Sequence, residues 1–112
     1  MSEKIILPVI PLRGLTILPG TTVHFDISRK TSIAAAKGAM LEGRKLFVVA
    51  QKDPVEEAPG FDGIYKVGTV VEVKQLNKLP DNIVRVMVEA KKRGRIYSLY
   101  ENGKRLDGEI EI

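Results

Sequence analysis

Hydrophobic residues in this chain recur mainly with a period of two, which is typical of β-strands with one buried face. Between residues 22 and 28, for example, Val23, Phe25 and Ile27 alternate with polar residues. The uninterrupted apolar run Leu46–Ala50 indicates a strand that is buried on both faces. On this basis, we expect strands at residues 23–28, 46–50, 67–74, 84–100 and 106–112, with a break or bulge at Gly94.

Residues 5–12 are also apolar, but they contain Pro8 and Pro11. Proline does not fit in a helix interior, and it has no N–H for a strand ladder. We therefore expect this segment to be an edge strand. Turn residues mark the ends of the later strands at positions 79–82, and Asn102-Gly103 predicts a β-hairpin with a type I′ turn.

One segment follows a helical period instead. Residues with the spacing of a single helical face are Ile33, Ala36 and Met40. Thr31 or Ser32 can cap the start of this helix, and Gly43 can end it. Gly38 costs the helix about 1 kcal/mol relative to alanine, so we expect tertiary packing to hold it. The pattern as a whole predicts a mainly β, α+β fold with six strands and one α-helix.

Composition narrows the class of protein. A length of 112 residues matches one domain, and 44% hydrophobic with 29% charged residues match a globular chain. Absence of cysteine excludes disulfides, thiol catalysis and zinc knuckles, and a single histidine excludes a multi-histidine metal site. The N-terminus has no apolar signal region and the longest apolar run is only five residues, so we expect a cytoplasmic protein without membrane segments. The last residues, 109–112, still alternate, and we expect this chain to be a fragment of a larger protein.

Two short patterns resemble catalytic or phosphate-binding motifs without having their geometry. His24, Asp26 and Ser28 share one strand face, where residues two apart lie about 6.6 Å from each other and cannot converge as a triad. Residues 38–45 have the glycine spacing of a phosphate loop, but they end in Arg-Lys and lie at the C-terminal end of the helix. We therefore expect no catalytic residue and no metal site in this chain.

The last hairpin carries the strongest charge feature. Its basic residues, six of the eighteen in the chain, are Lys91, Lys92, Arg93, Arg95, Lys104 and Arg105. Tyr97 and Tyr100 lie among them, a mixture that is typical of nucleic-acid-binding surfaces. An acidic stripe on one face of the same hairpin, which discourages edge pairing or neutralises these cations, consists of Asp107, Glu109 and Glu111. Nucleic-acid binding by the basic 91–105 hairpin stays open as an alternative function.

Six short segments along the chain form a combination that is more specific than any one of them. They are Pro11-Leu12-Arg13-Gly14, Leu18-Pro19-Gly20, Val48-Val49-Ala50-Gln51-Lys52-Asp53, Val67-Gly68-Thr69-Val70, Leu79-Pro80 and Val84-Arg85-Val86-Met87-Val88-Glu89. In this order and spacing, between about Leu7 and Tyr100, the chain resembles the N-terminal domain of the Lon protease family. Ala90 departs from the family pattern, which often has glycine there.

The resemblance implies a PUA-like, six-stranded β pseudo-barrel with one helix, in which residues 1–112 form a single domain. In that family, the domain recognises and tethers unfolded or tagged proteins for an ATP-dependent, homohexameric serine protease of the cytoplasm. It implies unfolded or damaged proteins as partners, and ATP with Mg²⁺ as cofactors of the full-length protein only. The motor and protease sites of the family lie further downstream, so the resemblance assigns no catalytic role to any residue here.

A domain that binds unfolded proteins needs exposed apolar surface, because unfolding reveals hydrophobic side chains that are normally buried. Candidates for this surface are Leu15, Ile17, Leu18, Pro19 and Met87. Methionine adapts its shape to many partners, and the alternation directs Met87 away from the valine face. The open alternative is that the loop residues close the end of the barrel and that Met87 packs under the helix.

Overall fold

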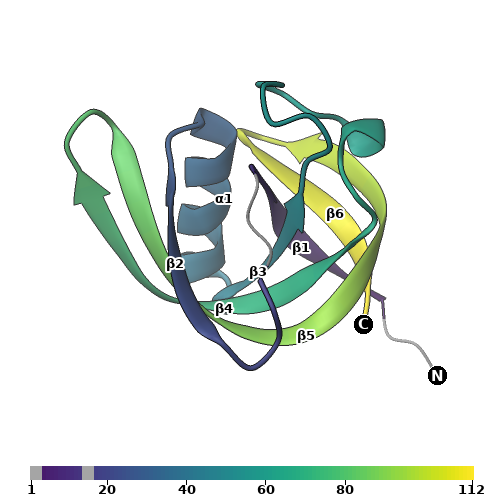
Figure 1. The fold of residues 1–112 in the computed structure, drawn as a ribbon. Helices are drawn as coiled ribbons and strands as arrows, with labels where there is room; N and C mark the ends of the chain where they lie inside the picture. Colours follow the sequence, from purple (N-terminus) through teal and green to yellow (C-terminus); the bar gives the residue numbers. More distant parts are fainter. Residues whose placement is uncertain (1–3, 14–16) are drawn as a thin grey trace.

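The computed structural model describes residues 4–13 and 17–112 (Figure 1). In chain order, its elements are β1 (Lys4–Leu12), β2 (Thr22–Ile27), α1 (Lys30–Leu41), β3 (Lys45–Ala50), the 3₁₀ turn η1 (Phe61–Gly63), β4 (Val67–Leu79), β5 (Ile83–Asn102) and β6 (Arg105–Glu111). The prediction of a mainly β fold with six strands and one α-helix is confirmed for these residues.

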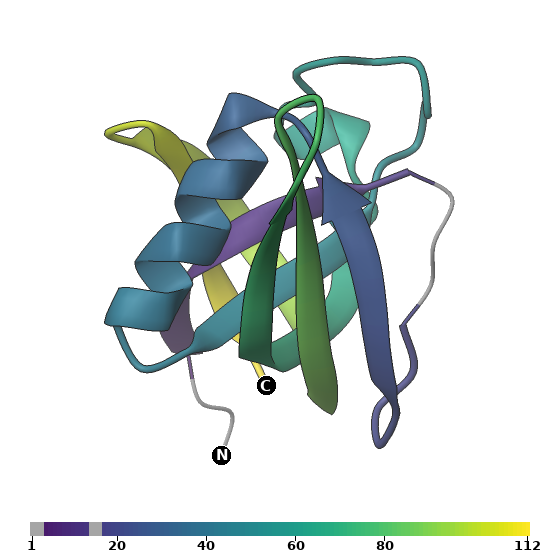
Figure 2. The ribbon, with the colours of Figure 1, turned by 90° about the vertical axis from the view of Figure 1, so that its left-hand side faces the viewer.

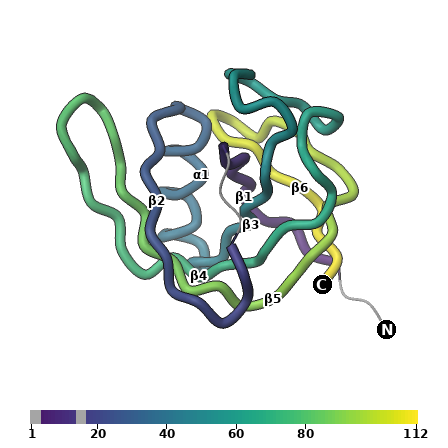
Figure 3. The backbone as a smooth tube through the Cα atoms, in the orientation of Figure 1, coloured from purple at the N-terminus to yellow at the C-terminus, as the bar shows by residue number. Residues whose placement is uncertain are grey.

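All six strands belong to one sheet, in the order β2-β5-β4-β3-β1-β6. Because β6 pairs with β5 as well as with β1, five of the strands close into a ring, which the tube in Figure 3 shows. β5 makes this closure possible, since its 20 residues pair with β2 and β4 along the first part and with β6 along the second. β2 has β5 as its only partner strand in the described residues, so it extends the sheet outside the ring.

The prediction that residues 5–12 form an edge strand is wrong. β1 pairs with β6 from Lys4 to Pro8 and with β3 from Val9 to Leu12, so it lies inside the sheet. Each half of the strand has its partner on one side, and every second N–H points away from that partner. Leu12 O accepts a hydrogen bond from the N–H of Gln51, the residue after β3, so Leu12 takes part in the hydrogen bonds of the parallel pair. The backbone N of Pro11, the residue before it, faces away from β3. A proline is tolerated at such a position.

Apolar side chains fill both sides of the curled sheet. Inside the ring lies a core to which all five ring strands contribute, formed by Leu7, Val9, Phe47, Val49, Ile64, Val70, Ile96 and Ile110. On the other side, α1 and β2 cover a second core that includes Phe25, Ala35, Ala36, Ala39, Leu46, Val48, Val71, Val73, Val86 and Val88. β3 contributes to both cores, as the apolar run 46–50 predicts.

The ends of α1 differ in how well the sequence predicts them. Its N-cap is Arg29, with no side-chain cap bond, so Thr31 and Ser32 lie within the first turn and the predicted cap is wrong. Gly43, with a φ of +98°, follows the helix end as predicted. Gly38 leaves room for the Arg105 guanidinium, which would have to shift if a Cβ were present at this position.

Two details of the long strand β5 also differ from expectation. Gly94 does not interrupt the strand but pairs with Gly68, and the register shifts fall at Lys91 and Tyr97 instead. The hairpin after β5 is confirmed, but its turn is not type I′. Only Gly103 has a positive φ there, whereas a type I′ turn needs two.

β4 and β5 extend beyond the ring as an arm beside α1, and β2 pairs with β5 along this arm (Figure 2). Asp81 and Asn82 take positive φ values of 66° and 59° in the turn that closes the arm, a conformation that Asp and Asn adopt more readily than most residues. Residues of this turn and of α1, among them Ile33 and Leu79, line a shallow cavity between the two elements. The arm therefore covers one flank of the helix.

Candidate functional site

A cavity of about 390 Å³ opens where two strands end and begin, between Ile17, the end of β3 and the start of β4. Its volume is in the range of small-ligand and side-chain pockets. Its walls are mostly apolar, and the apolar lining residues are Leu12, Ile17, Val48, Val49, Ala50, Tyr65 and Val67. The cavity is therefore a place where hydrophobic side chains of another molecule can be buried.

Three hydrogen bonds hold the segment that precedes β2 against the sheet beside this cavity. Thr69 Oγ1 donates to Ile17 O at 2.7 Å, and this threonine is itself buried. Further along, Gly20 N–H donates to Ala90 O at 3.0 Å, and Ala90 N–H donates to Thr21 O at 2.8 Å. These bonds keep Leu18 and Pro19 at the corner between the cavity and β5, where both are exposed.

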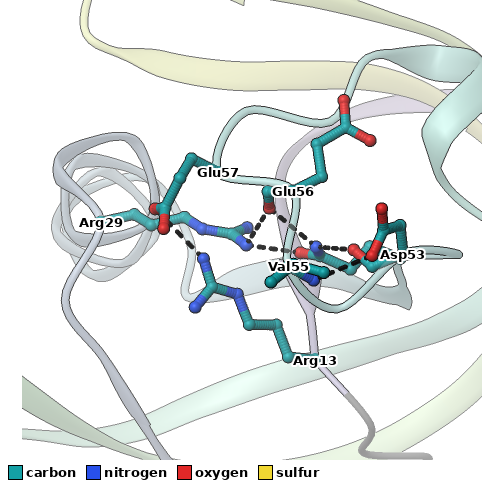
Figure 4. A network of polar contacts seen from close by, with 7 residues as sticks. Arg13, Arg29, Asp53, Val55, Glu56 and Glu57 are labelled. Carbon is teal, nitrogen blue, oxygen red and sulfur yellow. Dashed lines mark hydrogen bonds and ion pairs between the residues drawn. The ribbon is translucent and has the colours of Figure 1, made fainter.

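A polar network lies next to the end of β3, outside the lining of this cavity (Figure 4). Arg29 donates to Gln51 Oε1 at 2.6 Å and to Glu56 O at 2.9 Å, while Arg13 donates to Glu57 Oε2 at 3.2 Å. Burial lowers the pKa of Arg29, and so does the nearby Arg13 charge, but the bonds to neutral oxygens keep the guanidinium in place. The network ties the 52–60 loop to the start of α1 and to the end of β1.

The 52–60 loop is followed by η1 and then by Tyr65, which lines the cavity. Gln51 forms an isolated bridge with Ile64, and Tyr65 N–H donates to Ala50 O at 3.0 Å. Both contacts fix Tyr65 beside the end of β3, where its side chain is 53% exposed. No sequence pattern indicated Tyr65, because it lies in an irregular segment between η1 and β4.

The structure separates the five predicted apolar contact residues. Leu18 is 55% exposed, and Pro19 is exposed next to it. Ile17 is only 3% exposed, so the expectation that it offers free surface is wrong, since its side chain belongs to the core and closes the base of the cavity. Leu15 lies outside the described residues.

Met87 lies on the outer face of β5, opposite His24 of β2. Its neighbours Val86 and Val88 point into the core beneath α1, so the alternative in which Met87 packs under the helix is wrong. Its side chain is half-buried on this polar face. Met87 lies three residues, or about 10 Å along the strand, from Ala90, which bonds the segment before β2. Met87 does not line the cavity.

Val67 lines the cavity together with Thr69, which lies two residues further along β4. It is 46% exposed because the sheet face is uncovered at the mouth of the cavity. Among the described residues, Tyr65 and Val67 are therefore the exposed large apolar side chains of the cavity lining, and exposed Leu18 follows the lining residue Ile17.

The predicted basic hairpin does not form one continuous patch. Arg105 turns inward, where it donates to Asp107 Oδ1 at 2.9 Å and contacts Glu42, and the Glu42 hydrogen bond raises the pKa of Arg105. Lys91 pairs with Glu89 on the outer face of the sheet. Lys104 lies in the turn after β5. The strand ends at Asn102, seven residues after Arg95, so this turn lies about 23 Å along the strand from Arg95.

Lys92, Arg93 and Arg95 remain exposed on one part of β5. Arg93 lines the same cavity as Ile17 and Val67. The structure therefore places one residue of the basic candidate surface, Arg93, in the same cavity as Ile17 of the apolar candidate surface, although the sequence alone assigned the two surfaces to alternative functions.

The residues that resembled catalytic motifs have structural roles. His24, Asp26 and Ser28 are exposed, and Arg85 Nε donates to Asp26 Oδ1 at 2.8 Å, which lowers the pKa of Asp26. Asp107 is buried, and β6 has a partner strand on each side, so the interpretation of an acidic stripe along a free edge is wrong. In the described ranges, no group of three His, Cys, Asp or Glu side chains could hold a metal ion. No helix in these ranges is long and apolar enough to cross a membrane.

Comparison with known proteins agrees with a binding domain built on this fold. Residues 6–112 match the family model of the ATP-dependent protease La (LON) substrate-binding domain. The chain belongs to this family of Lon substrate-binding domains, as the resemblance in its sequence implied.

Its relatives are much longer proteins. The chain is 42% identical to a Lon protease of Clostridium acetobutylicum over 97% of its own length and 14% of the relative. It is 37% identical to a Lon protease of Escherichia coli K12, over 98% of its own length and 14% of the relative. The chain thus spans about a seventh of these relatives.

Solved structures share the fold. The N-terminal domain of the Mycobacterium avium complex Lon protease superposes with a TM-score of 0.73 at 19% identity, over 94% of this chain and 53% of that one. A Lon N-terminal domain protein from Xanthomonas campestris gives a TM-score of 0.70 at 19% identity, over 95% of this chain and 58% of that one. The PUA-like pseudo-barrel expected from the sequence is therefore confirmed as the fold.

Proposed function

We propose that this chain binds apolar segments of unfolded or damaged proteins in the cavity beside Leu18 and tethers them for proteolysis. The observation that carries the proposal is the cavity itself, with exposed Tyr65 and Val67 in its lining and exposed Leu18 next to its lining residue Ile17, in a member of the Lon substrate-binding family. Folded proteins keep most large apolar side chains inside, so a site of this kind engages segments that unfolding has exposed.

The protease that receives these segments would be a longer protein of the Lon type, of which this chain is a non-catalytic part. Its ATP-dependent motor, with Mg²⁺, and its serine protease site would then lie outside residues 1–112. A cavity for one or two side chains binds weakly on its own. Several copies in a cytoplasmic homohexamer would raise the effective affinity through multivalency.

Replacing apolar residues at the mouth of the cavity is expected to weaken binding of an unfolded protein. Leu18→Ser and Tyr65→Ser should each raise the Kd about fivefold, because each removes apolar area worth about 1 kcal/mol when it is buried by a partner. Fluorescence anisotropy with a labelled polypeptide, kept unfolded by removal of its disulfides, measures the Kd. Chemical-shift mapping on the same samples should place the perturbed amides around residues 17–20, 48–50 and 65–69.

Leu41→Ser is the matched control, since Leu41 is 87% exposed but lies at the C-terminal end of α1, away from the cavity. It should leave the Kd unchanged. Equal losses in all three variants, or shifts confined to Met87 and the outer face of β5, would contradict the proposed site. Tight RNA binding that falls steeply with salt and is lost in Lys92→Glu would instead support the nucleic-acid alternative.

A further inference from the structure

We propose that the cavity selects apolar segments in which a carboxylate lies next to the apolar side chain. This inference rests on the proposed function, because it requires that protein segments enter the cavity at all. Beyond apolar character, the bound segment would carry a negative charge, because the charged residues of the cavity lining are basic.

Two basic residues line the cavity and no acidic residue does, among the described residues that form its walls. One of the two is Lys66, whose Nζ donates to Ile64 O at 2.9 Å and also bonds Phe61 O. The same nitrogen lies 3.9 Å from the centroid of the Phe61 ring. All of these partners are neutral, so they hold the ammonium group in place without cancelling its charge.

The other basic residue is Arg93, which pairs with Thr69 across the sheet at the cavity wall. Its side chain is exposed, and within residues 4–13 and 17–112 no carboxylate forms an ion pair with it. Elsewhere on β5, Arg85 is paired with Asp26 and Lys91 with Glu89. Lys92 and Arg95 form no ion pair among the described residues either, but they do not line the cavity. Arg93 is therefore available to an acidic group from outside the chain.

A guanidinium with five donors and no carboxylate partner among the described residues matches the two oxygens of a carboxylate. Apolar walls exclude water from the contact, which strengthens the attraction between the opposite charges. A segment that offers both groups can bury its apolar side chain beside Val67 and place its carboxylate on Arg93. A nucleic-acid phosphate supplies only the charge and leaves the apolar walls unfilled, so the cavity as a whole fits an acidic apolar peptide better.

The carboxylate can come from an Asp or Glu side chain or from the C-terminus of a polypeptide, and a peptide series separates these sources. All peptides share one Leu-Phe core. One arm compares Glu with Gln directly after the core inside the chain. The other arm ends the peptide at the core, as a free acid or as an amide. Fluorescence anisotropy at low ionic strength gives the Kd of each peptide.

For the unmodified chain, we expect at least one acid to bind about fivefold more tightly than its neutral counterpart. Arg93→Gln should reduce this ratio toward one, because it removes the guanidinium that distinguishes the acid from its neutral counterpart. Lys104→Gln removes the same charge at the far turn of the hairpin and should keep the ratio. An advantage of the Glu peptide identifies a side-chain carboxylate as the source, whereas an advantage of the free acid alone identifies a chain terminus.

Equal binding of acid and neutral peptides, or a ratio that survives Arg93→Gln, would overturn the charge preference and leave the proposed function standing. Neutral and acidic peptides that bind without any effect of Tyr65→Ser would show that the cavity is not the site. If no peptide binds, the proposed function fails, and the charge preference fails with it.

Discussion

Replacing Phe47 with alanine is expected to lower the free energy of unfolding by about 3–5 kcal/mol. Phe47 is fully buried in the core inside the ring, and its aromatic ring packs against the paired glycines of β4 and β5. A Cβ built on Gly68 would lie 2.7 Å from Phe47 Cζ, and one built on Gly94 would lie 3.3 Å from Cε1. Truncation therefore leaves a cavity where three strands meet, and urea denaturation followed by far-UV circular dichroism measures the loss.

Phe47→Leu tests whether the loss comes from the missing volume. It keeps much of the side chain and should cost clearly less than alanine. Val55→Ala, at an exposed loop position, should leave the midpoint unchanged. A loss below about 1.5 kcal/mol for Phe47→Ala would show that the ring can collapse around the gap, contrary to close packing of strands that are paired on both sides.

The contact of Phe47 with Gly68 and Gly94 shows what the sequence does and does not predict about this fold. Alternation correctly identifies the strands, because it reports which positions are buried. It does not say which strand lies next to which, since that depends on how the ring closes. From the sequence alone, Gly94 is therefore expected to be a break or bulge, whereas in β5 its missing side chain makes room for Phe47 and Ile110.

The same limit explains the errors at β1 and β6. Both have features that are typical of edges, prolines in one and acidic residues in the other. Yet β1 changes partner at Pro8, and β6 lies between β1 and β5. Strand closure removes the edges that these residues were expected to protect, and closure depends on long-range pairing that local composition does not encode.

The candidate site was predictable in part. Exposed Leu18 and Pro19 follow from a short turn with apolar residues, and Arg93 follows from charge clustering. Their proximity does not follow, because it depends on the bonds of Thr69 and Ala90 to the 17–21 segment. Apolar and basic residues were therefore treated as belonging to different functions, although Ile17 and Arg93 line one cavity.

Arg105 was also assigned to the surface, although the sequence contains a hint of its role. Arg105 and Asp107 are two residues apart on a strand and so share one face. The structure buries Asp107 to 3% exposure and surrounds it with Arg105 and Asn102, whose Nδ2 donates at 2.7 Å. Gly38 of α1 leaves the space that the Arg105 guanidinium occupies on its way to Glu42. The ion pair between Arg105 and Glu42 thus connects β6 to the C-terminal end of α1.

Replacing Arg105 with methionine is expected to destabilise the fold by about 3 kcal/mol. The change keeps much of the aliphatic stem but leaves the Asp107 carboxylate buried with Asn102 as its remaining side-chain donor in the described residues. An unpaired buried charge costs more than the ion pair itself contributes, so the double variant Arg105→Met, Asp107→Leu should be more stable than Arg105→Met alone. Urea denaturation of both variants gives the difference.

Gly38→Ala provides an independent check on the same contact, because its effect should change sign with the Arg105 background. With Arg105 present, the added Cβ would lie 2.1 Å from Nη1, so the guanidinium must move and the variant should be destabilised. With methionine at 105, the collision is relieved and the higher helix propensity of alanine, about 1 kcal/mol, should stabilise the chain. The same effect of Gly38→Ala in both backgrounds would contradict the packing of Arg105 against α1, because coupling of this kind requires direct contact.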